Sequence, residues 1–409
     1  MSGFDEKDLT RELHERSQDM GGHPIGLDAV KGSARRTQRR RRVAGAVAAM
    51  AVAVVVVPVG LSLTGTSTTG TGPVGQPTPT AASASPSPSD SPSASQSPSK
   101  PAGDGSIPLV VAGLPTGAPP AVPWIEGRTL HHDGTTDQLP GDYSDIASYR
   151  GGWLAVGMGK DGPTVTRIDP NGQVVSTKPG GYSIAVSGDG TQIAWVEDGA
   201  LHRGLPSGMS DGEDTQPLPP GRPASPVGFA GGEVVYKFDA GNDIIHVTDL
   251  NGHDRALPGL IGARGTSDTG GFVAGETSYN SQDGTSCWAL RDVMSDKNRL
   301  EDCDWTLESA SPDGRYVVGQ PSGADGTGTS VLAVMDSGSG AVVRKFASPR
   351  KPSAMAATWA WEDDQHLLAT VWDGTDWWIL RLGVDGSVEK AAGPVQGPDY
   401  DAPYHLIGR

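Results

Sequence analysis

Hydrophobic residues are distributed along this chain in one long run and many short ones. The long run is Val43 to Leu63, which has no charged side chain and, apart from Ser62, no polar one. As a helix it extends about 31 Å, which matches the roughly 30 Å hydrocarbon core of a bilayer. We therefore predict a transmembrane helix over residues 43–63. A cleaved signal peptide and a buried core helix are the alternatives.

The charges beside this run predict its orientation. Arginine occupies six of the eight positions in residues 35–42, whereas residues 64–106 contain only three charged side chains. Because basic residues flank membrane helices on the cytoplasmic side, we expect the amino terminus in the cytoplasm. The chain is then a single-pass protein of the cell membrane, with everything after residue 63 outside.

The two segments that flank the predicted helix lack the residues for a hydrophobic core. Residues 1–42 are expected to form a cytoplasmic head, mostly disordered, with a short helix over Asp8–Gln18. Residues 64–107 consist largely of Ser, Thr, Pro, Ala and Gly, so we expect a disordered stalk. Globular structure is therefore expected over residues 108–409.

A tight turn followed by a short apolar strand recurs six times in this last part of the chain. The last turn residues are Gly152, Gly190, Gly232, Gly271, Gly314 and Gln365. Their spacings of 38, 42, 39, 43 and 51 residues are typical of propeller blades. A second series of Asp, Asn and Gly turns lies between them, so each repeat is predicted to contain several strands joined by hairpins.

The predicted fold class is therefore all-β, a β-propeller with seven blades, and six or eight blades are the alternatives. Six repeats are complete, and one, Trp124 to Pro140, lacks a strand. We expect Tyr404 to Gly408 to supply that strand, because joining the two ends of the chain removes the exposed sheet edges of an open array.

The net charge differs between the two sides of the predicted membrane helix. The whole chain carries −16, and residues 1–42 carry +3, so the rest carries −19. An acidic exterior argues against nucleic acid and anionic lipid as partners. Cationic ligands, sugars, peptides and proteins remain, and simple solubility is the other explanation.

The chain contains two cysteines, Cys287 and Cys303. A turn is expected at Met294–Asp296, midway between them, so the two side chains should face each other across a hairpin. Because this part of the chain is expected in an oxidising compartment, we predict a disulfide. A pair of buried free thiols is the alternative.

No motif in the sequence indicates catalysis or a bound cofactor. Gly157–Gly162 matches the glycine pattern of dinucleotide sites, but a strand follows it and not a helix, so we predict a hairpin. No nucleophile, base or metal-ligand set is evident, so we predict no enzyme activity, no cofactor and no metal site.

Tryptophans are concentrated in the last repeat, between Trp359 and Trp378. We expect them mainly to fill the space between blades. The alternative for Trp372, Trp377 and Trp378 is a ligand platform that stacks on a sugar or a peptide. Neighbouring strand residues point to opposite faces, so Trp377 and Trp378 should lie on different sides of their sheet.

Two stretches of the exterior part resemble repeats of a known kind. Ser311–Gly319 (SPDGRYVVG) and Ser187–Val196 (SGDGTQIAWV) look like repeats of TolB-like and WD40-like propellers. The resemblance implies the fold and a tendency to bind proteins or peptides, with no particular ligand.

The head has a resemblance of its own. It is similar to the heads of actinobacterial membrane proteins that are often encoded beside alternative sigma factors. The matching residues are Leu13, His14, Arg16 and Arg39 to Arg42. This resemblance implies a cytoplasmic regulatory protein, sigma-factor-like, as a partner of residues 1–42.

These expectations describe a non-catalytic, membrane-anchored protein that binds or senses a partner outside the cell through its propeller. The partner is a protein, a peptide or another ligand, and nucleic acid is not expected. A cell-wall carbohydrate-binding protein and a propeller-fold hydrolase are the alternatives.

Overall fold

The computed structural model of the protein describes residues 105–207, 213–238, 244–282, 284–324, 328–349 and 354–408. The predicted head and transmembrane helix, and the predicted stalk as far as residue 104, lie outside these ranges. Every regular element within the described ranges is a β-strand. They contain no helix that is long and apolar enough to cross a membrane.

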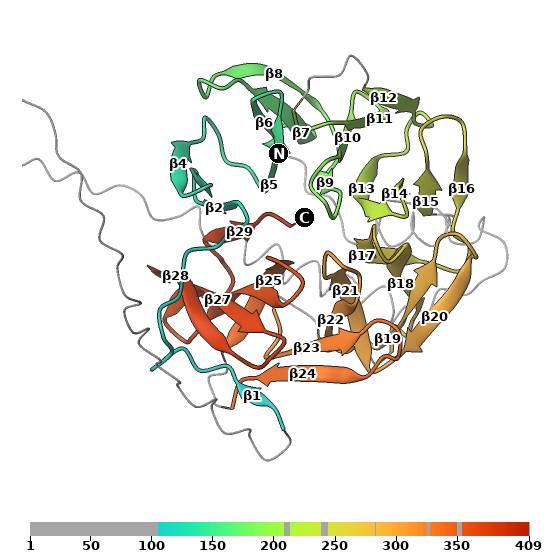
Figure 1. Ribbon diagram of the computed structural model, residues 1–409. Helices are drawn as coiled ribbons and strands as arrows, with labels where there is room; N and C mark the ends of the chain where they lie inside the picture. The colour runs from blue at the N-terminus through green and yellow to red at the C-terminus, as the bar shows by residue number, and fades with distance from the viewer. Residues whose placement is uncertain are drawn as a thin grey trace, which may run out of the picture. The chain divides into compact units, whose positions relative to one another are not determined.

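The strands form seven sheets around a common axis, as the blades of a propeller (Figure 1). We number the blades in chain order and give their strands from the axis outward. Blade 1 contains β29 (Tyr404–Leu406), β2 (Trp124–Glu126), β3 (Thr129–His132) and β4 (Thr135–Gln138). Blade 2 contains β5 (Asp145–Tyr149), β6 (Gly152–Gly159), β7 (Gly162–Ile168) and β8 (Val174–Pro179). Blade 3 contains β9 (Ala185–Val186), β10 (Ile193–Glu197), β11 (Ala200–Gly204) and β12 (Asp214–Pro217).

The remaining blades follow the same plan. Blade 4 contains β13 (Ala224–Ala230), β14 (Glu233–Phe238), β15 (Ile245–Thr248) and β16 (Asp254–Ala256). Blade 5 contains β17 (Gly262–Ser267), β18 (Phe272–Tyr279), β19 (Ser286–Asp292) and β20 (Lys297–Asp302). Blade 6 contains β21 (Trp305–Ala310), β22 (Tyr316–Pro321), β23 (Val331–Asp336), β24 (Val342–Ala347) and β1 (Ile107–Pro108). Blade 7 contains β25 (Met355–Trp361), β26 (His366–Trp372), β27 (Asp376–Gly383) and β28 (Val388–Gln396).

The predicted fold class and the count of seven blades are confirmed. The turn that marked each repeat in the sequence joins the first and second strands of blades 2 to 7. Glycine is required at several of these turns because the backbone there is left-handed, as at Gly190 (φ 70°) and Gly232 (φ 83°). At Gly152 the requirement is space, since a Cβ would lie 2.1 Å from the carbonyl oxygen of Ile168.

The ring closes as predicted, with a strand from the carboxyl end of the chain completing blade 1. β29 pairs antiparallel with β2, with Leu406 opposite Trp124 and Tyr404 opposite Glu126. Tyr404 is buried between blades 7 and 1, and Ile407 is buried between blades 1 and 2. The first and last parts of the propeller are therefore joined within one sheet.

Residues 105–121 form an extended segment, here called the strap, that crosses the outer edges of blades 6 and 7 before the chain enters blade 1. The strap adds β1 to blade 6 as a fifth strand, parallel to β24. Leu109 and Val111 are 1% and 4% exposed and pack into the core between blades 6 and 7. This extra strand was not predicted. Ile107, which the sequence analysis assigns to the end of the stalk, is its first residue.

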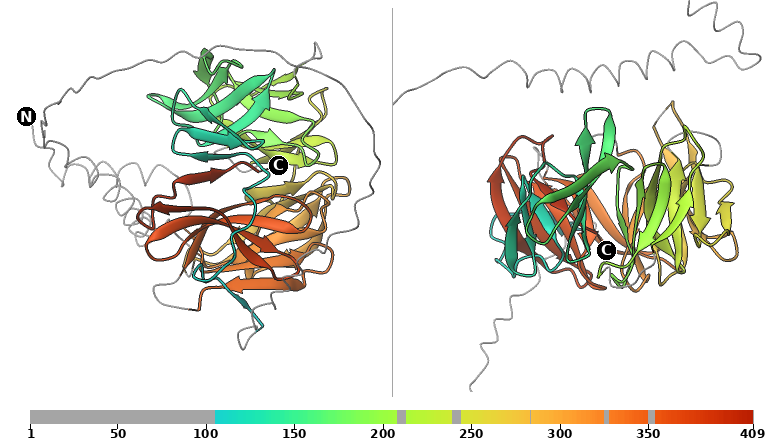
Figure 2. Two further views of the ribbon diagram at one scale, coloured as in Figure 1. Left: turned by 60° about the vertical axis from the view of Figure 1, so that its left-hand side comes forward. Right: turned by 90° about the horizontal axis from the view of Figure 1, so that it is seen from above.

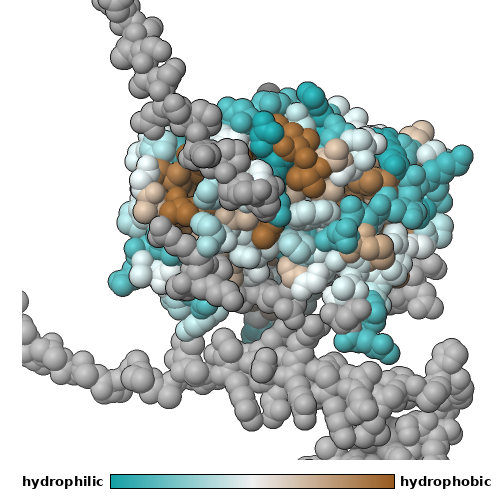
Figure 3. All heavy atoms as spheres, turned by 90° about the horizontal axis from the view of Figure 1, so that it is seen from below, coloured by the Kyte–Doolittle hydropathy of each residue, from teal (hydrophilic) through white to brown (hydrophobic). Residues whose placement is uncertain are grey.

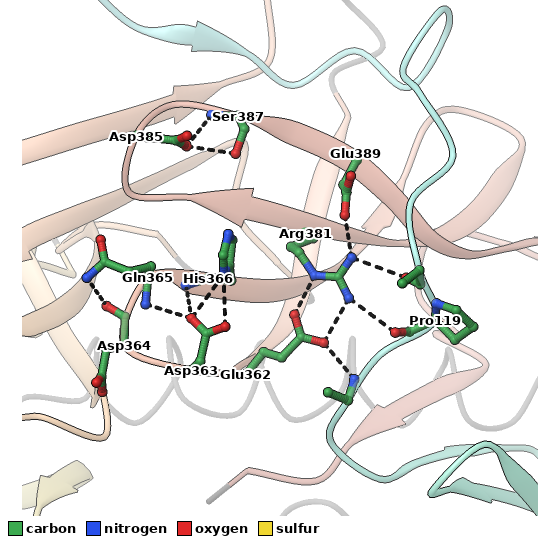
Figure 4. Close-up of polar contacts among 12 residues, drawn as sticks. Pro119, Glu362, Asp363, Asp364, Gln365, His366, Arg381, Asp385, Ser387 and Glu389 are labelled. Atoms are coloured by element: carbon green, nitrogen blue, oxygen red, sulfur yellow. Dashed lines mark hydrogen bonds and ion pairs between the residues drawn. The ribbon is translucent and has the colours of Figure 1, made fainter. Parts of the chain in front are cut away.

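A single arginine fixes the end of the strap on blade 7 (Figure 4). Arg381 in β27 donates to the carboxylates of Glu362 and Glu389 and, at 3.2 Å each, to the carbonyl oxygens of Ala118 and Pro119. Glu362 also accepts a hydrogen bond from the backbone nitrogen of Ala121. The side chains of Arg381 and Glu362 are 11% and 5% exposed. We call these residues the strap latch.

Hydrophobic side chains fill the spaces between neighbouring blades. Separate clusters lie between blades 3 and 4, around Phe229 and Tyr236, and between blades 5 and 6, around Phe272 and Leu307. Such packing places apolar residues on both faces of each sheet, which explains the near-continuous apolar runs of the second strands. The surface seen from below in Figure 3 is mostly hydrophilic, with hydrophobic side chains gathered in separate patches.

The structure contains the predicted disulfide between Cys287 and Cys303, with an S–S distance of 2.03 Å. Cys287 lies in β19 and Cys303 directly follows β20, and the adjacent pair Trp288 and Asp302 lie directly opposite each other. The cysteines therefore face each other across the hairpin, as was predicted from a turn near residue 295.

Replacing both Cys287 and Cys303 by serine is expected to lower the free energy of unfolding by up to about 3 kcal/mol. The cross-link closes a loop with a sequence separation of 16 residues, so it restricts the unfolded chain only modestly. Denaturant titration of the wild type and of the double variant, each with and without reductant, measures the difference. A wild-type protein that reductant does not destabilise would contradict the assignment.

Candidate interaction face

The two ends of the ring carry different connections. Neighbouring strands within each four-stranded blade are antiparallel. The hairpins between second and third strands and the connections between blades therefore lie at one end, which we call the loop face. The remaining hairpins of the blades lie at the opposite end, which we call the turn face. Figure 2 (right) shows the ring edge-on, with connections at both ends of the strands.

Interblade connections on the loop face repeat a short sequence. Four of them read Pro-Gly-x followed by an apolar or aromatic residue: Pro140–Tyr143, Pro179–Tyr182, Pro220–Pro223 and Pro258–Ile261. The connection from blade 7 to blade 1 has the variant Gly-Pro-Asp-Tyr, ending at Tyr400. The sequence analysis missed this repeat because it followed the turns of the other end, although the Pro-Gly pairs are a visible signal.

Several of these terminal side chains are exposed although they are large and apolar. Tyr182 is 54% exposed, Tyr400 is 55% exposed and Ile261 is 45% exposed, whereas Tyr143 is half-buried. Large exposed apolar groups at repeated positions are typical of interaction surfaces. The loop face is therefore the candidate functional site.

The loop that carries Tyr182 is held rigidly. The backbone nitrogen of Tyr182 donates to Ser225 Oγ at 2.9 Å, and Ser183 Oγ donates to the carbonyl oxygen of Pro226 at 2.6 Å. A Cβ at Gly180 would lie 2.4 Å from Val165, so only glycine allows this close approach. The position of the tyrosine is thus fixed by contacts with blades 2 and 4.

Asp145, the first residue of β5, connects two of these loops. Its Oδ2 accepts a hydrogen bond from the nitrogen of Ile184 at 2.8 Å, and its Oδ1 accepts one from Ile146 at 2.9 Å. Ile184 follows the Tyr182 loop, whereas Asp145 itself follows the Tyr143 loop. Burial raises the pKa of Asp145 to about 6, although both hydrogen bonds favour the charged form. The carboxyl group of Asp145 therefore fixes the position of the Tyr182 loop relative to the Tyr143 loop.

Trp372 and Trp377 support the loop between blades 7 and 1. Trp372 Nε1 donates to the carbonyl oxygen of Gly397 at 3.1 Å, and Trp377 Nε1 donates to that of Pro398 at 2.9 Å. Both acceptors lie just before Tyr400. The two indoles therefore hold the backbone that leads to this tyrosine, which is a different role from stacking on a ligand.

The exposure of the three tryptophans corrects the ligand platform that was predicted from the sequence. Trp377 has 0% exposure and packs with Trp124 and Tyr404 between blades 7 and 1, so its assignment to an exposed platform is wrong. Trp378 lies against the core on the other side of β27, and its Nε1 donates to Asp373 at 3.0 Å. Trp372 and Trp378 are both half-buried. The expectation that tryptophans fill the space between blades is confirmed for Trp377.

The loops at the junctions of blades 7–1 and 1–2 carry acidic side chains, and neither these two loops nor the loop between blades 2 and 3 contains Lys or Arg. Asp142, Asp399 and Asp401 are exposed, and Asp142 makes only a 3.9 Å ion pair with Arg128. Within the described residues, no hydrogen bond is made to the carboxylate of Asp399 or Asp401, and the charge of Asp401 acts on the imidazole of His405. These carboxylates are thus available to a partner.

Several acidic residues of the turn face accept hydrogen bonds within their own turns. Asp169 Oδ1 accepts hydrogen bonds from the nitrogens of Asn171 and Gln173, at 2.9 and 2.8 Å. Asp385 accepts similarly from Ser387 at 2.9 Å. These backbone hydrogen bonds lower the pKa of Asp169 and of Asp385. These two carboxylates therefore stabilise hairpins, in contrast to those of Asp142, Asp399 and Asp401.

A larger group of charged side chains lies between blades 2 and 3, and its members pair with one another. Glu197 is 3% exposed, and its Oε2 accepts from Arg167 at 3.0 Å and from Trp195 at 3.1 Å. Its Oε1 lies 3.2 Å from Lys178 Nζ. Burial alone raises the pKa of Glu197, but the hydrogen bonds from Arg167 and Trp195 outweigh burial and lower it. Since each charge is compensated, this group holds the two blades together.

A short internal repeat supports the neighbouring hairpins of the loop face. The pattern Trp-x-Glu-x-x-x-Leu-His occurs at residues 124–131 and at residues 195–202. In both copies the histidine stacks on the tryptophan, with ring centroids 3.6 Å apart in the first and 5.1 Å apart in the second. Burial lowers the pKa of His131 and His202, so both rings are mainly neutral at pH 7. The sequence analysis did not identify this repeat.

The described residues contain no group of three His, Cys, Asp or Glu side chains that could hold a metal ion. Gly157–Gly162, the dinucleotide-like glycine pattern, forms the hairpin between β6 and β7, as predicted. What the geometry offers is therefore a rigid surface with exposed aromatic and acidic groups.

Comparisons with known proteins find likeness only among solved structures. No protein family and no curated protein matches the sequence. The propeller domain of Cps50 (Swd1) from Myceliophteria thermophila is 12% identical, with a TM-score of 0.41, and covers 63% of this chain and 87% of its own. A putative TolB from Agrobacterium tumefaciens is 14% identical, with a TM-score of 0.36, and covers 57% and 91%. A protein of unknown function from Desulfotomaculum acetoxidans is 14% identical, with a TM-score of 0.41, and covers 70% and 99%.

Proposed function

We propose that this protein is a non-catalytic recognition protein that binds a protein or peptide partner on the loop face of its propeller. The observation that carries the proposal is the set of exposed side chains at repeated loop positions, Tyr182, Tyr400 and Ile261. Rigid loops lose little conformational entropy on binding, and tyrosine supplies a large contact area with two rotatable bonds. The buried charges of Glu197 and Glu362 are compensated by Arg167 and Arg381.

The proposal includes a membrane anchor and an exterior location. Residues 43–63 have the length and apolarity of a membrane-spanning helix, and the arginines of residues 35–42 favour a cytoplasmic amino terminus. Residues 1–42 then form a cytoplasmic head, with a regulatory, sigma-factor-like protein as its proposed partner. Binding outside reaches the cytoplasm through clustering of the chains or through a change at the head.

Site-specific photo-crosslinking in intact cells tests both parts of the proposal. A photoreactive amino acid replaces Tyr182 or Tyr400 on the loop face, Asp133 on the turn face as a control, or Leu13 in the head. We expect discrete adducts from the two loop-face positions and none from residue 133. Protease added to intact cells should destroy the loop-face adducts and leave those of the head.

Two results would overturn the proposal. Absence of adducts from both loop-face positions would show that this face does not bind a partner. Protection of the propeller from added protease would show that it is not exterior.

A further inference from the structure

We infer that the partner on the loop face presents an extended, positively charged segment of polypeptide, rich in Lys or Arg. The segment is bound along an arc formed by Tyr400, Tyr143 and Tyr182. This inference rests on the proposed function and specifies the chemistry of its partner.

The three tyrosines occupy successive junctions of the ring. Tyr400 lies between blades 7 and 1, Tyr143 between blades 1 and 2, and Tyr182 between blades 2 and 3. Asp145 ties the second of these loops to the third, and Trp372 and Trp377 support the first. Because every loop is fixed by its own contacts, the arc is preformed. An extended segment matches such an arc better than a compact domain with a single protruding residue.

The acidic residues along this arc determine the sign of the partner's charge. Asp399 and Asp401 flank Tyr400 directly, and Asp142 precedes Tyr143. A cationic side chain between a tyrosine ring and an adjacent carboxylate gains both a cation–π contact and a charge-assisted hydrogen bond. Anionic or uncharged segments gain neither. The surplus of acidic residues outside residues 1–42 adds attraction at longer range.

The opposite end of the ring does not offer the same combination. Several of its aspartates accept hydrogen bonds from the backbone of their own turns, as Asp169 and Asp385 do. Most of its exposed arginines are paired with acids, for example Arg299 with Asp292. Free carboxylates beside exposed aromatic rings are therefore a property of the loop face.

Fluorescence anisotropy with the full-length protein tests the inference. The protein is placed in nanodiscs of phosphatidylcholine, which carry no net charge, and the probe is a labelled peptide of alternating lysine and serine. We expect saturable binding that weakens as salt is added. Matched peptides with glutamate or glutamine in place of lysine are expected not to bind.

Variants separate local recognition from a general charge effect. The triple substitution D142N, D399N and D401N is expected to raise the Kd for the lysine peptide at least about tenfold, or about 1.4 kcal/mol. The pair Y182A and Y400A is expected to have an effect of similar size, and Y182F with Y400F should retain binding because the rings remain.

A matched control removes the same charge elsewhere. Its substitutions, D133N, D296N and E301Q, lie on the turn face and on the outer strand of blade 5. Asp133 and Asp296 have positive φ values of 46° and 53°, which asparagine also tolerates. The hydrogen bond that Arg291 donates to Asp296 Oδ1 at 2.9 Å can equally be accepted by the amide oxygen of asparagine, so folding should be preserved. The control is expected to change Kd less than twofold, that is by under about 0.4 kcal/mol.

Three results would overturn the inference: equal binding of the glutamate peptide, equal loss of affinity in the matched control, or no loss in the loop-face variants. If photo-crosslinking from Tyr182 or Tyr400 succeeds while the lysine peptide does not bind, the recognition function stands and the cationic partner is excluded. If both experiments fail, the loop face is not the binding site.

Discussion

Deletion of residues 404–409 is expected to open the ring and to abolish cooperative thermal unfolding of the propeller. The deletion removes β29 and leaves β2 without its inner partner. It also removes Tyr404 and Ile407, which are 1% and 5% exposed, from the cores on both sides of blade 1. Loss of two such side chains costs roughly 5–10 kcal/mol. This is comparable with the whole stability of a typical domain, about 5–15 kcal/mol.

Differential scanning calorimetry and near-ultraviolet circular dichroism measure this effect. We expect the truncated protein to lose its calorimetric transition and its fixed aromatic signal. A second protein that lacks only residues 408 and 409 serves as the control, because Gly408 is exposed and should not contribute to closure. A sharp transition near the wild-type temperature in the longer deletion would show that β29 is dispensable.

Replacing Arg381 by methionine is expected to lower the free energy of unfolding by about 3–5 kcal/mol. The substitution retains most of the side-chain volume but leaves the carboxylate of Glu362, 5% exposed, without its cation. It also removes the donors to Ala118 and Pro119, so this end of the strap loses two of its hydrogen bonds to blade 7. An unpaired buried charge is costly because little water can solvate it.

Arg299→Met is the matched control, since its ion pair with Asp292 is more exposed than the latch, with the arginine side chain 39% and the aspartate side chain 19% exposed. Surface pairs contribute at most about 1 kcal/mol, so this variant should be nearly as stable as the wild type. Arg381→Lys should be intermediate, because lysine keeps the charge but lacks the planar fork that reaches four acceptors. Denaturant titration ranks the three variants. Equal stability of the Arg381→Met and Arg299→Met proteins would show that the latch is not a structural anchor.

The sequence predicted the propeller because its turns have a strict local chemistry. A left-handed backbone position strongly favours glycine, and glycines such as Gly190 and Gly314 therefore recur at the spacing of the blades. The incomplete first repeat also predicted the closing strand, because an unpaired inner edge at Trp124 requires a partner. The disulfide was predicted in a similar way, from a hairpin turn expected midway between the two cysteines.

No comparable pattern in the sequence predicted the strap or its latch. β1 is two residues long, and the contact between Ala121 and Glu362 joins positions 241 apart in the chain. A short strand in a Ser- and Pro-rich context has the composition of the stalk that precedes it. Whether Ile107 is stalk or sheet is decided by the apolar space between blades 6 and 7, which exists only after the ring has formed.

The candidate site also combines features that the sequence shows with features that only the structure shows. Residue types in the loops, such as the tyrosines and aspartates of the Pro-Gly repeats, are readable from the sequence, but their exposure is not. Trp377 and Tyr400 are both aromatic and close in the chain, yet one is 0% exposed and the other 55% exposed. The difference arises because Trp377 lies on a strand that faces blade 1, whereas Tyr400 lies on a loop beyond the last strand.

The sequence by itself determined the all-β repeat, the blade number, the closing strand and the disulfide. Each of these depends on local turn geometry or on pairing within one sheet, and both leave a periodic trace in the residues. Tertiary structure alone decided where the strap lies, which tryptophans are buried and which carboxylates remain free. Those features depend on contacts between blades, whose partners are distant in the chain and are selected by shape and charge, without any period in the sequence.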